Sequence, residues 1–344
     1  MSKKLIQKKI LYPILLIVSL LSISITHVHA GSVQNENVKL RIVILPYLSF
    51  APFFIAQEEG FFKEQGLDVE YVKLSEGLEA LPLLIQGKLD VATGTIGINM
   101  LNAIARGGNV KIVADKGHIN PKGCPVNGIL VRSGLINDGS DIANQLRGKK
   151  ISLNPISTDG YYVEKAINKI GLTMNDLQIK GFLIPPMRAQ ALKSGSIDIV
   201  HVSEPWVTRI LREGHSTLWV SAKDVVPNFQ YAATVFGPNL LNKNRKAGQR
   251  FMIAYLKAIR QYNTGKTDRN VEILSKYSGV KRELLLEACW PYLDSTGQID
   301  VNSFLDFQKW AMEKGLLDSP VKEDQFWDPS FIEHANHVLG KASK

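Results

Sequence analysis

The chain has 344 residues, a length that suggests about two domains. Hydrophobic residues make up 45% of it and charged residues 21%, which is ordinary for a soluble globular protein whose core needs no covalent or metal support. The formal net charge is +9, but residues 1–30 hold four lysines and no acidic residue, so the remainder carries only +5. No block of lysine and arginine remains, which argues against nucleic acid as a partner.

Residues 1–30 follow the three-part pattern of a secretory signal peptide. Four lysines between positions 3 and 9 precede an apolar stretch from Ile10 to Ile25, and Val28-His29-Ala30 follows as a cleavage signal. We therefore expect cleavage near Ala30 and an exported, periplasmic protein. The alternative is a retained membrane anchor, but the apolar run is shorter than the roughly 20 residues that cross a bilayer.

Strand and helix signals alternate from residue 38 to about residue 236, which favours α/β units with largely parallel strand pairing. The expected order begins with a strand at 38–45, a helix at 52–59, a strand at 67–74, a helix at 77–86, a strand at 91–93, a helix at 96–106 and strands at 110–115 and 128–132. It continues with a helix at 142–146, a strand at 150–154, a helix at 160–170, a strand at 179–183, a helix at 187–194, a strand at 197–201, a helix at 206–213 and a strand at 217–221. From Ala247 to about residue 340 the pattern predicts almost only helix.

One segment of the first half returns in the second. Residues 84–91, Leu-Ile-Gln-Gly-Lys-Leu-Asp-Val, match residues 192–199, Leu-Lys-Ser-Gly-Ser-Ile-Asp-Ile. Both predict a helix, a glycine cap and a short buried strand. Many helices end at a glycine, so the match alone leaves coincidence open. A true repeat would give two similar lobes with a ligand cleft between them.

Residues 45–70 carry a longer motif, Leu-Pro-Tyr-Leu-Ser-Phe-Ala-Pro-Phe-Phe-Ile-Ala-Gln-Glu-Glu-Gly-Phe-Phe-Lys-Glu-Gln-Gly-Leu-Asp-Val-Glu. This segment closely resembles the opening of periplasmic solute-binding proteins of the nitrate/taurine/alkanesulfonate and thiamine-precursor (NMT1-like) type, which feed ABC importers. The resemblance extends through both Leu-x-x-Gly-x-x-Asp turns and Ser203-Glu204-Pro205-Trp206 to a helical tail with Trp290, Gly297 and Trp310, and so covers nearly all of the chain after residue 30.

The resemblance implies a two-lobed α/β fold of the type II-like periplasmic binding proteins, with two mixed or parallel sheets flanked by helices. Residues 31–127 with 228–344 would form the first lobe and residues 128–227 the second. Two strands would cross between the lobes near 128–133 and 221–231. The function it implies is capture of one small solute by hinge closure and delivery to an ABC permease and its ATPase, by a monomer without a cofactor.

The candidate ligand-binding residues lie where expected strands end and helices begin, because free N–H groups there bind polar groups. The same residues would otherwise cap helices or pack in the core. The candidates are Tyr47, Ser49 and Phe50 after the first strand; Thr93 and Thr95 around Gly94; Asn154, Ser157, Thr158 and Asp159; Glu204, as an acceptor for an amine, and Trp206, as a stacking ring; and Tyr231 near the second crossing.

The ligand's charge stays open at this point. No arginine lies in these loops to grip a carboxylate or sulfonate, and Arg188, the nearest one, is expected to be solvated. Asp159 and Glu204 would repel an anion. Three ligand classes therefore stay open: a sulfonate or a carboxylate, as the resemblance implies, or a planar nitrogen heterocycle.

Catalytic motifs are missing from the sequence. It contains no G-x-S-x-G elbow, no Walker loop and no zinc-ligand spacing, so we expect neither an enzyme nor a metal site. The alternatives are a periplasmic sensory protein and an enzyme of the pyrimidine-synthase-like branch of this fold. Cys124 and Cys289 are expected to be two separate buried thiols, with a disulfide as the alternative.

Overall fold

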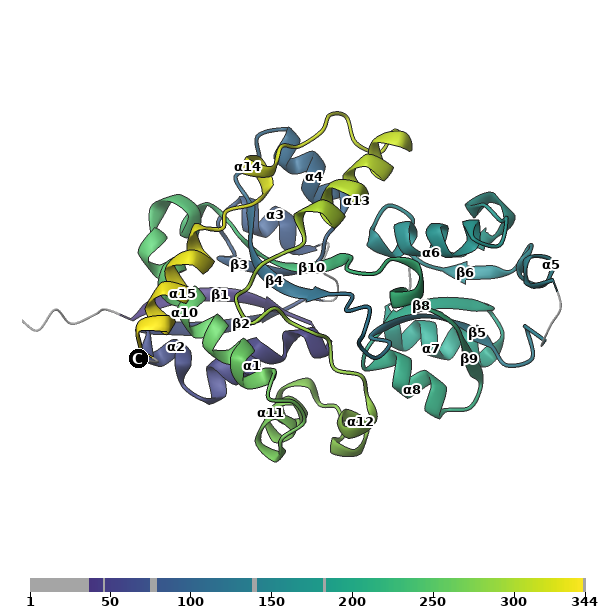
Figure 1. The fold of residues 1–344 in the computed structure, drawn as a ribbon, viewed down its shortest axis with the longest axis horizontal. Coiled ribbons are helices and arrows are strands. Elements are labelled where there is room, and N and C mark those ends of the chain that lie inside the picture. Colours follow the sequence, from purple (N-terminus) through teal and green to yellow (C-terminus); the bar gives the residue numbers. More distant parts are fainter. Residues whose placement is uncertain (1–36, 46, 75–78, 138–140, 182–183, 343–344) are drawn as a thin grey trace, which may run out of the picture. The chain divides into compact units, whose positions relative to one another are not determined.

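The computed structural model describes residues 37–342, apart from 46, 75–78, 138–140 and 182–183. The signal peptide expected at residues 1–30 lies outside the described residues. The described residues belong to one compact unit, Glu36–Lys344, that contains two five-stranded sheets (Figure 1).

The first sheet has the strand order β2-β1-β3-β10-β4. β1 pairs in parallel with β2 and β3, whereas β10 runs antiparallel between β3 and β4. β10 comes from far along the chain, after all five strands of the second sheet. Its strands are β1 (Val38–Ile44), β2 (Leu67–Lys73), β3 (Val91–Thr95), β4 (Lys111–His118) and β10 (Gln230–Phe236).

The second sheet has the order β7-β6-β8-β5-β9, and it repeats the pattern of the first. β6 pairs in parallel with β7 and β8, and β5 runs antiparallel between β8 and β9. Each sheet thus contains one antiparallel strand, β10 in the first and β5 in the second, between its last two neighbours. The expected fold of two mixed sheets is confirmed. The strands are β5 (Asn127–Arg132), β6 (Lys150–Ser152), β7 (Gln178–Ile179), β8 (Ile199–Ser203) and β9 (Ser216–Ser221).

The two matching segments take the same position in the two sheets. Gly87 and Gly195 each end a helix with a positive φ, 70° and 74°, a conformation that glycine adopts without steric cost. The next acidic residues also act alike: the carboxylate of Asp90 accepts the N–H of Arg41 at 2.7 Å, and that of Asp198 accepts the N–H of Lys150 at 3.0 Å. The sequence echo therefore reflects a structural repeat.

Helices cover both sheets, and the chain after β10 is almost wholly helical, as predicted (Figure 1). None of the helices in the described part of the chain has the length and apolar character that a membrane crossing requires. The helices are α1 (Ala51–Glu58), α2 (Phe61–Glu64), α3 (Ala80–Ile85), α4 (Ile98–Ala105), α5 (Ile142–Leu146), α6 (Thr158–Asn168), α7 (Pro185–Ser194), α8 (Trp206–Arg212), α9 (Ala222–Val225), α10 (Arg245–Tyr262), α11 (Asp268–Ser278), α12 (Arg282–Glu287), α13 (Val301–Glu313), α14 (Glu323–Phe326) and α15 (Ser330–Ala342), with 3-10 turns at Leu48–Phe50 and Met174–Asp176 and a π-helical turn at Asn239–Lys243.

The main core lies around α10, which packs against α1 and α15. The rings of Phe53 and Tyr255 stack with their centroids 4.8 Å apart, and Phe251 joins them. All three side chains are fully buried. Burial of each such ring contributes about 1.5–3 kcal/mol, so this aromatic stack holds the first strand-to-helix turn rigidly in place.

The chain crosses between the sheets twice. It leaves β4 at His118, enters β5 at Asn127, and returns from β9 through α9 to β10 at Gln230. Residues 128–132, expected as a crossing strand, instead pair within the second sheet as β5. The lobe boundaries predicted at 127/128 and 227/228 stay a prediction.

Cys124 and Cys289 form a disulfide, with Cα atoms 5.7 Å apart, so the expectation of two separate thiols is wrong. Cys124 lies in the first crossing and Cys289 follows α12. They are 165 positions apart, the segment between them includes the whole second sheet, and no local pattern in the sequence could reveal that its ends meet.

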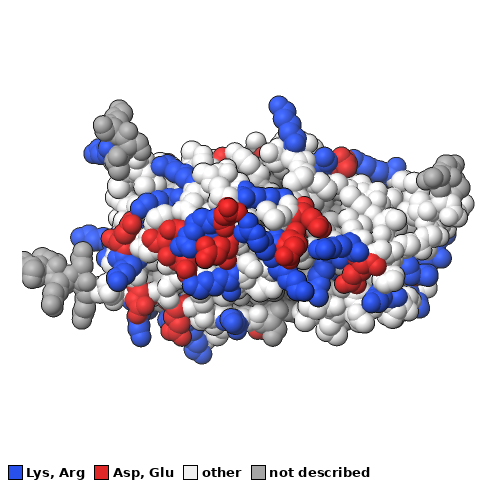
Figure 2. All heavy atoms as spheres, turned by 90° about the horizontal axis from the view of Figure 1, so that it is seen from below, with Lys and Arg blue, Asp and Glu red and all other residues white. Residues whose placement is uncertain are grey.

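Charged side chains of both signs are intermixed over one face of the molecule (Figure 2). Ion pairs join α1 and α2 to the C-terminal helices, for example Arg269 to Glu59 at 2.7 Å and Lys257 to Glu64 at 2.6 Å. Such a balanced surface is typical of a solvated face rather than of a polyanion-binding one.

Candidate functional site

A cavity of about 260 Å³ lies between the two sheets and is lined from both. The first side contributes the turn after β1, the end of β3 and the start of α4. The second side contributes the turn before α6, the start of α7 and the end of β8. These are the strand ends and helix starts at which α/β proteins bind their ligands.

The cavity brings together nine of the twelve candidate residues. Thr158 and Trp206 are buried but do not line it, and β3 ends at Thr95, whose side chain lies outside the described part of the structure. The nine that line the cavity are Tyr47, Ser49, Phe50, Thr93, Asn154, Ser157, Asp159, Glu204 and Tyr231.

Lys116 lies on the first wall of the cavity and is 2% exposed. Its Nζ donates to the Ser49 hydroxyl at 2.7 Å and lies 3.7 Å from the centre of the Phe50 ring. Burial lowers the pKa of Lys116 to about 7, although the charge of neighbouring Asp115 acts in the opposite direction. A buried amine with such a pKa is held in a site that solvates its charge poorly.

Lys116 was not among the candidate residues because the strand was expected to end at residue 115. β4 continues to His118. Successive residues of a strand face opposite sides, so Asp115 points away from the cavity when Lys116 points into it. A strand predicted to continue to His118 would have placed the Lys116 amine near Ser49, in the turn after β1.

The opposite wall holds a charged cluster of Asp159, Arg188 and His201. Arg188 pairs with Asp159 at 3.5 Å and donates to the backbone oxygen of His201. Arg188 is 3% exposed, so the expectation that it is solvated is wrong. Arg188 is a buried residue of α7, and the Asp159 carboxylate compensates its charge.

The pKa of Asp159 falls to about 2. Burial alone would raise this pKa, but the charges and hydrogen-bonding groups of His201 and Arg188 outweigh it. His201 Nδ1 lies 3.1 Å from Asp159 Oδ1, while His201 Nε2 has no hydrogen-bond partner among the described residues.

Asp159 should give the protein an acid-dependent stability. A carboxyl pKa near 2, against 3.8 in the unfolded chain, contributes stability above pH 4 that disappears as the pH falls through 2. Between pH 5 and pH 2 the wild type should therefore lose about 2 kcal/mol more than Asp159→Asn. Thermal unfolding of both across this range measures the difference. The exposed Asp318→Asn is the control, and equal acid slopes for all three proteins would contradict the assignment.

Glu204 lines the cavity, but its carboxylate is already bonded. Oε1 accepts the Thr208 hydroxyl at 2.7 Å and the N–H of Cys289 at 3.0 Å, and Oε2 accepts the N–H of Thr208 at 3.1 Å. Burial raises the pKa of Glu204 above its ordinary value, and these hydrogen bonds offset part of that rise. Glu204 thus caps α8 and ties it to the segment after α12.

Trp206 packs in the smaller core of the second sheet with Val207 and Ile210. The Arg209 guanidinium lies over its ring at 4.8 Å. Ser157 caps α6 by accepting the N–H of Asp159 at 3.1 Å. Trp206 therefore packs in the core and Ser157 caps a helix, the roles expected as alternatives to ligand binding. Ser157 also lines the cavity.

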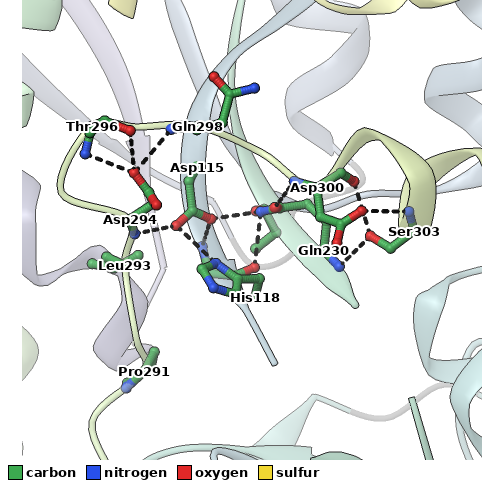
Figure 3. A network of polar contacts seen from close by, with 12 residues as sticks. Asp115, His118, Gln230, Pro291, Leu293, Asp294, Thr296, Gln298, Asp300 and Ser303 are labelled. Carbon is green, nitrogen blue, oxygen red and sulfur yellow. Dashed lines mark hydrogen bonds and ion pairs between the residues drawn. The ribbon is translucent and has the colours of Figure 1, made fainter. Parts of the chain in front are cut away.

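A polar network surrounds Asp115, the residue before Lys116 on β4, at the ends of the two crossings (Figure 3). Asp115 accepts hydrogen bonds from Gly117 N and Gln230 Nε2 through Oδ1, and from Asp294 N through Oδ2. His118 Nδ1 lies 3.3 Å from Asp115. Burial lowers the pKa of His118, but the Asp115 carboxylate outweighs burial and holds this pKa above its ordinary value.

The two sides of the cavity also contact each other. Gly97 at the start of α4 forms a backbone bridge with Ser157 at the start of α6, and both residues line the cavity. Away from the cavity lining, Trp310 Nε1 donates to Glu164 at 3.0 Å, and Arg212 lies 3.7 Å from Glu287. These contacts connect the helices after β10 to those of the second sheet.

Within the described residues, no group of three or more histidine, cysteine, aspartate and glutamate side chains is arranged to hold a metal ion. The two cysteines of the chain are joined to each other, so no thiol is available as a nucleophile.

The chain belongs to the NMT1/THI5-like family, whose model matches residues 48–263. The resemblance found in the sequence is thereby confirmed. A Brucella abortus (strain 2308) protein, named only as a candidate binding protein, is 24% identical over 251 residues, 72% of this chain and 74% of that protein.

Solved structures share the fold. The ligand-binding component of an ABC-type import system from Staphylococcus aureus, solved with zinc bound, has a TM-score of 0.72 at 19% identity and covers 87% of this chain and 99% of its own. The periplasmic nitrate-binding protein NrtA from Synechocystis PCC 6803 has a TM-score of 0.73 at 18% identity, with 88% and 89% covered.

An enzyme also has this fold. The desulfurization enzyme DSZB has a TM-score of 0.62 at 16% identity and covers 88% of this chain and 99% of its own. Identities at this level show a common fold and leave the chemistry to the residues of each site.

Proposed function

We propose that this protein is the extracytoplasmic solute-binding component of an ABC importer. It captures one small molecule in the cavity between its two sheets and delivers it to a membrane permease and its ATPase. The cavity carries the proposal, because residues from the sides of both sheets line a space of about 260 Å³ that suits a small solute. Membership of the family and the shared fold of the S. aureus import component support it.

Export and cleavage near Ala30 are part of the proposal. The Cys124–Cys289 disulfide supports them, because disulfides persist in the oxidising periplasm and are rare in the cytoplasm. The protein would work there as a monomer without a cofactor and without nucleic acid. The ligand-binding residues we propose are the cavity-lining candidates together with Lys116, Arg188 and His201.

Binding without turnover is the role that the site favours. Asp159 and Glu204, the two acidic residues that line the cavity, are engaged by Arg188, Thr208 and Cys289. Ser49 lies beside Lys116 with the spacing of a nucleophile and a base, which makes ester or amide hydrolysis the second candidate. Whether the recovered ligand is chemically unchanged distinguishes binding from hydrolysis.

Native mass spectrometry of the mature protein as purified tests the proposal. We expect one small molecule per chain, released on unfolding, and the same molecule added back should raise the melting temperature because it binds only the folded state. It should be recovered chemically unchanged after prolonged incubation. A protein without ligand that gains no stability from nitrate, sulfonates, carboxylates, amines or pyrimidines would refute the binding function, and conversion of the ligand would identify an enzyme.

A further inference from the structure

The cavity contains one buried charge that the protein does not neutralise locally. Among the described residues, the Lys116 ammonium has a single hydrogen-bond acceptor, the Ser49 hydroxyl, although it carries three N–H donors. The remaining contact is the face of the Phe50 ring. Two donors are therefore left for a group inside the cavity.

The carboxylate of the neighbouring residue Asp115 does not accept either of the two remaining Lys116 donors. Asp115 precedes Lys116 on β4, and its oxygens accept from Gly117, Gln230 and Asp294 on the other side of the strand (Figure 3). Across the cavity, Asp159 is already engaged by Arg188 and His201.

The rest of the cavity wall is largely apolar around this amine. Leu45, Ile96, Ile98, Met100 and Val235 line it from the first side. A charge in such surroundings is costly unless a counter-charge accompanies it. A ligand that carries the counter-charge and covers the apolar wall would gain binding free energy from both contacts.

Resting on the proposed function, we propose that Lys116 and Ser49 hold the oxyanion head of a small organic monoanion whose apolar body fills the remaining cavity. A carboxylate and a sulfonate share this chemistry. This assignment departs from the expectation, based on Asp159 and Glu204, that an anion would be repelled, because both acids are compensated within the second side.

The pH dependence of binding follows from the depressed pKa of Lys116, about 7 in the free protein. The other titratable groups around the cavity are Asp115 on the same strand, Tyr231 on β10, Tyr47 after β1, and Asp159, Arg188, His201 and Glu204 opposite. A bound anion favours the charged amine, so affinity should be constant below pH 7 and fall up to tenfold per pH unit above it.

The substitution Lys116→Met tests the assignment, because it should raise the stability of the ligand-free protein and lower its affinity for the anion. It keeps the volume of the side chain and removes the charge, so the ligand-free protein should melt at a higher temperature than the wild type. The gain should be largest below pH 7, where the wild-type amine is charged in the cavity. The same variant should bind the anion at least a hundredfold more weakly and lose the pH dependence, whereas exposed Lys193→Met should change neither property.

The probes for isothermal titration calorimetry are hexanoate, hexanesulfonate and benzoate, with hexanamide and hexylamine as neutral and cationic counterparts and nitrate as an anion without an apolar body. We expect an organic anion to bind at one site per chain, with Ser49→Ala weakening it about tenfold. The carboxylate and sulfonate arms identify which head group is preferred.

Three outcomes would overturn the assignment alone, and a fourth would overturn it together with the proposed function. Preference for hexanamide or hexylamine, or equal binding of an anion by wild type and Lys116→Met, would refute it and leave the binding function intact. So would a lower melting temperature of ligand-free Lys116→Met. If no probe binds and no molecule co-purifies, the assignment and the proposed function fail together.

Discussion

Asp115→Ala is expected to lower the free energy of unfolding by about 3–5 kcal/mol. The carboxylate is fully buried, and its loss leaves the N–H groups of Gly117 and Asp294 without an acceptor. Each buried donor left unpaired costs about 1–3 kcal/mol, and the Gln230 amide and the imidazole of His118 lose a partner as well. Urea unfolding followed by tryptophan fluorescence measures the change.

The matched control is Asp318→Ala. Asp318 pairs with Arg106 at 3.0 Å, but both side chains are more than 70% exposed, so this ion pair should contribute less than about 1 kcal/mol. Asp115→Asn should fall between the wild type and Asp115→Ala, because its amide retains one acceptor oxygen. An Asp115→Ala protein within 1 kcal/mol of the wild type would contradict the role given to this network.

The network matters for binding as well as for stability. It joins the end of β4 and the start of β10, where the chain leaves and re-enters the first sheet, to the loop at Asp294 (Figure 3). Lys116 is the next residue on β4. An Asp115 variant that still folds should therefore also bind its ligand more weakly, since the strand that positions the amine has lost its support.

Local patterns in the sequence predicted most of the elements, although no strand was expected at Gln230–Phe236, which forms β10. The helix-glycine-strand turns at Gly87 and Gly195 were correctly placed, because the glycine conformation and the following buried strand depend on neighbouring residues. The first turn after β1 was also found, since a strand followed by Pro52 and an apolar run is a local signal. These features specify where the cavity lies.

Long-range contacts explain what the sequence did not reveal. Asp115 and Asp294 are 179 residues apart, and Arg188 is buried only because Asp159 on another helix compensates it. Lys116 was hidden inside a strand, where a single lysine is usually solvated. The chemistry of the cavity therefore depends on pairs of residues whose proximity arises from the tertiary fold.

The disulfide gives the second large effect. Cys124→Ser, Cys289→Ser and the double variant should each lose about 2–5 kcal/mol of unfolding free energy, because the bond closes a loop across a sequence separation of 165. The long loop makes the unfolded state of the oxidised protein much more restricted than that of the reduced one. Urea unfolding with and without reductant measures the difference.

The three variants provide their own control, since each removes the same crosslink. Their losses should be equal rather than additive, and reductant should destabilise only the wild type. A double variant that loses the sum of two single losses would instead indicate separate packing roles. The bond also fixes the segment in which Cys289 donates to Glu204 and Pro291 lines the cavity, so ligand affinity should fall along with stability. Unchanged affinity in the Cys289→Ser protein would show that the cavity wall is positioned by the Glu204 hydrogen bond alone.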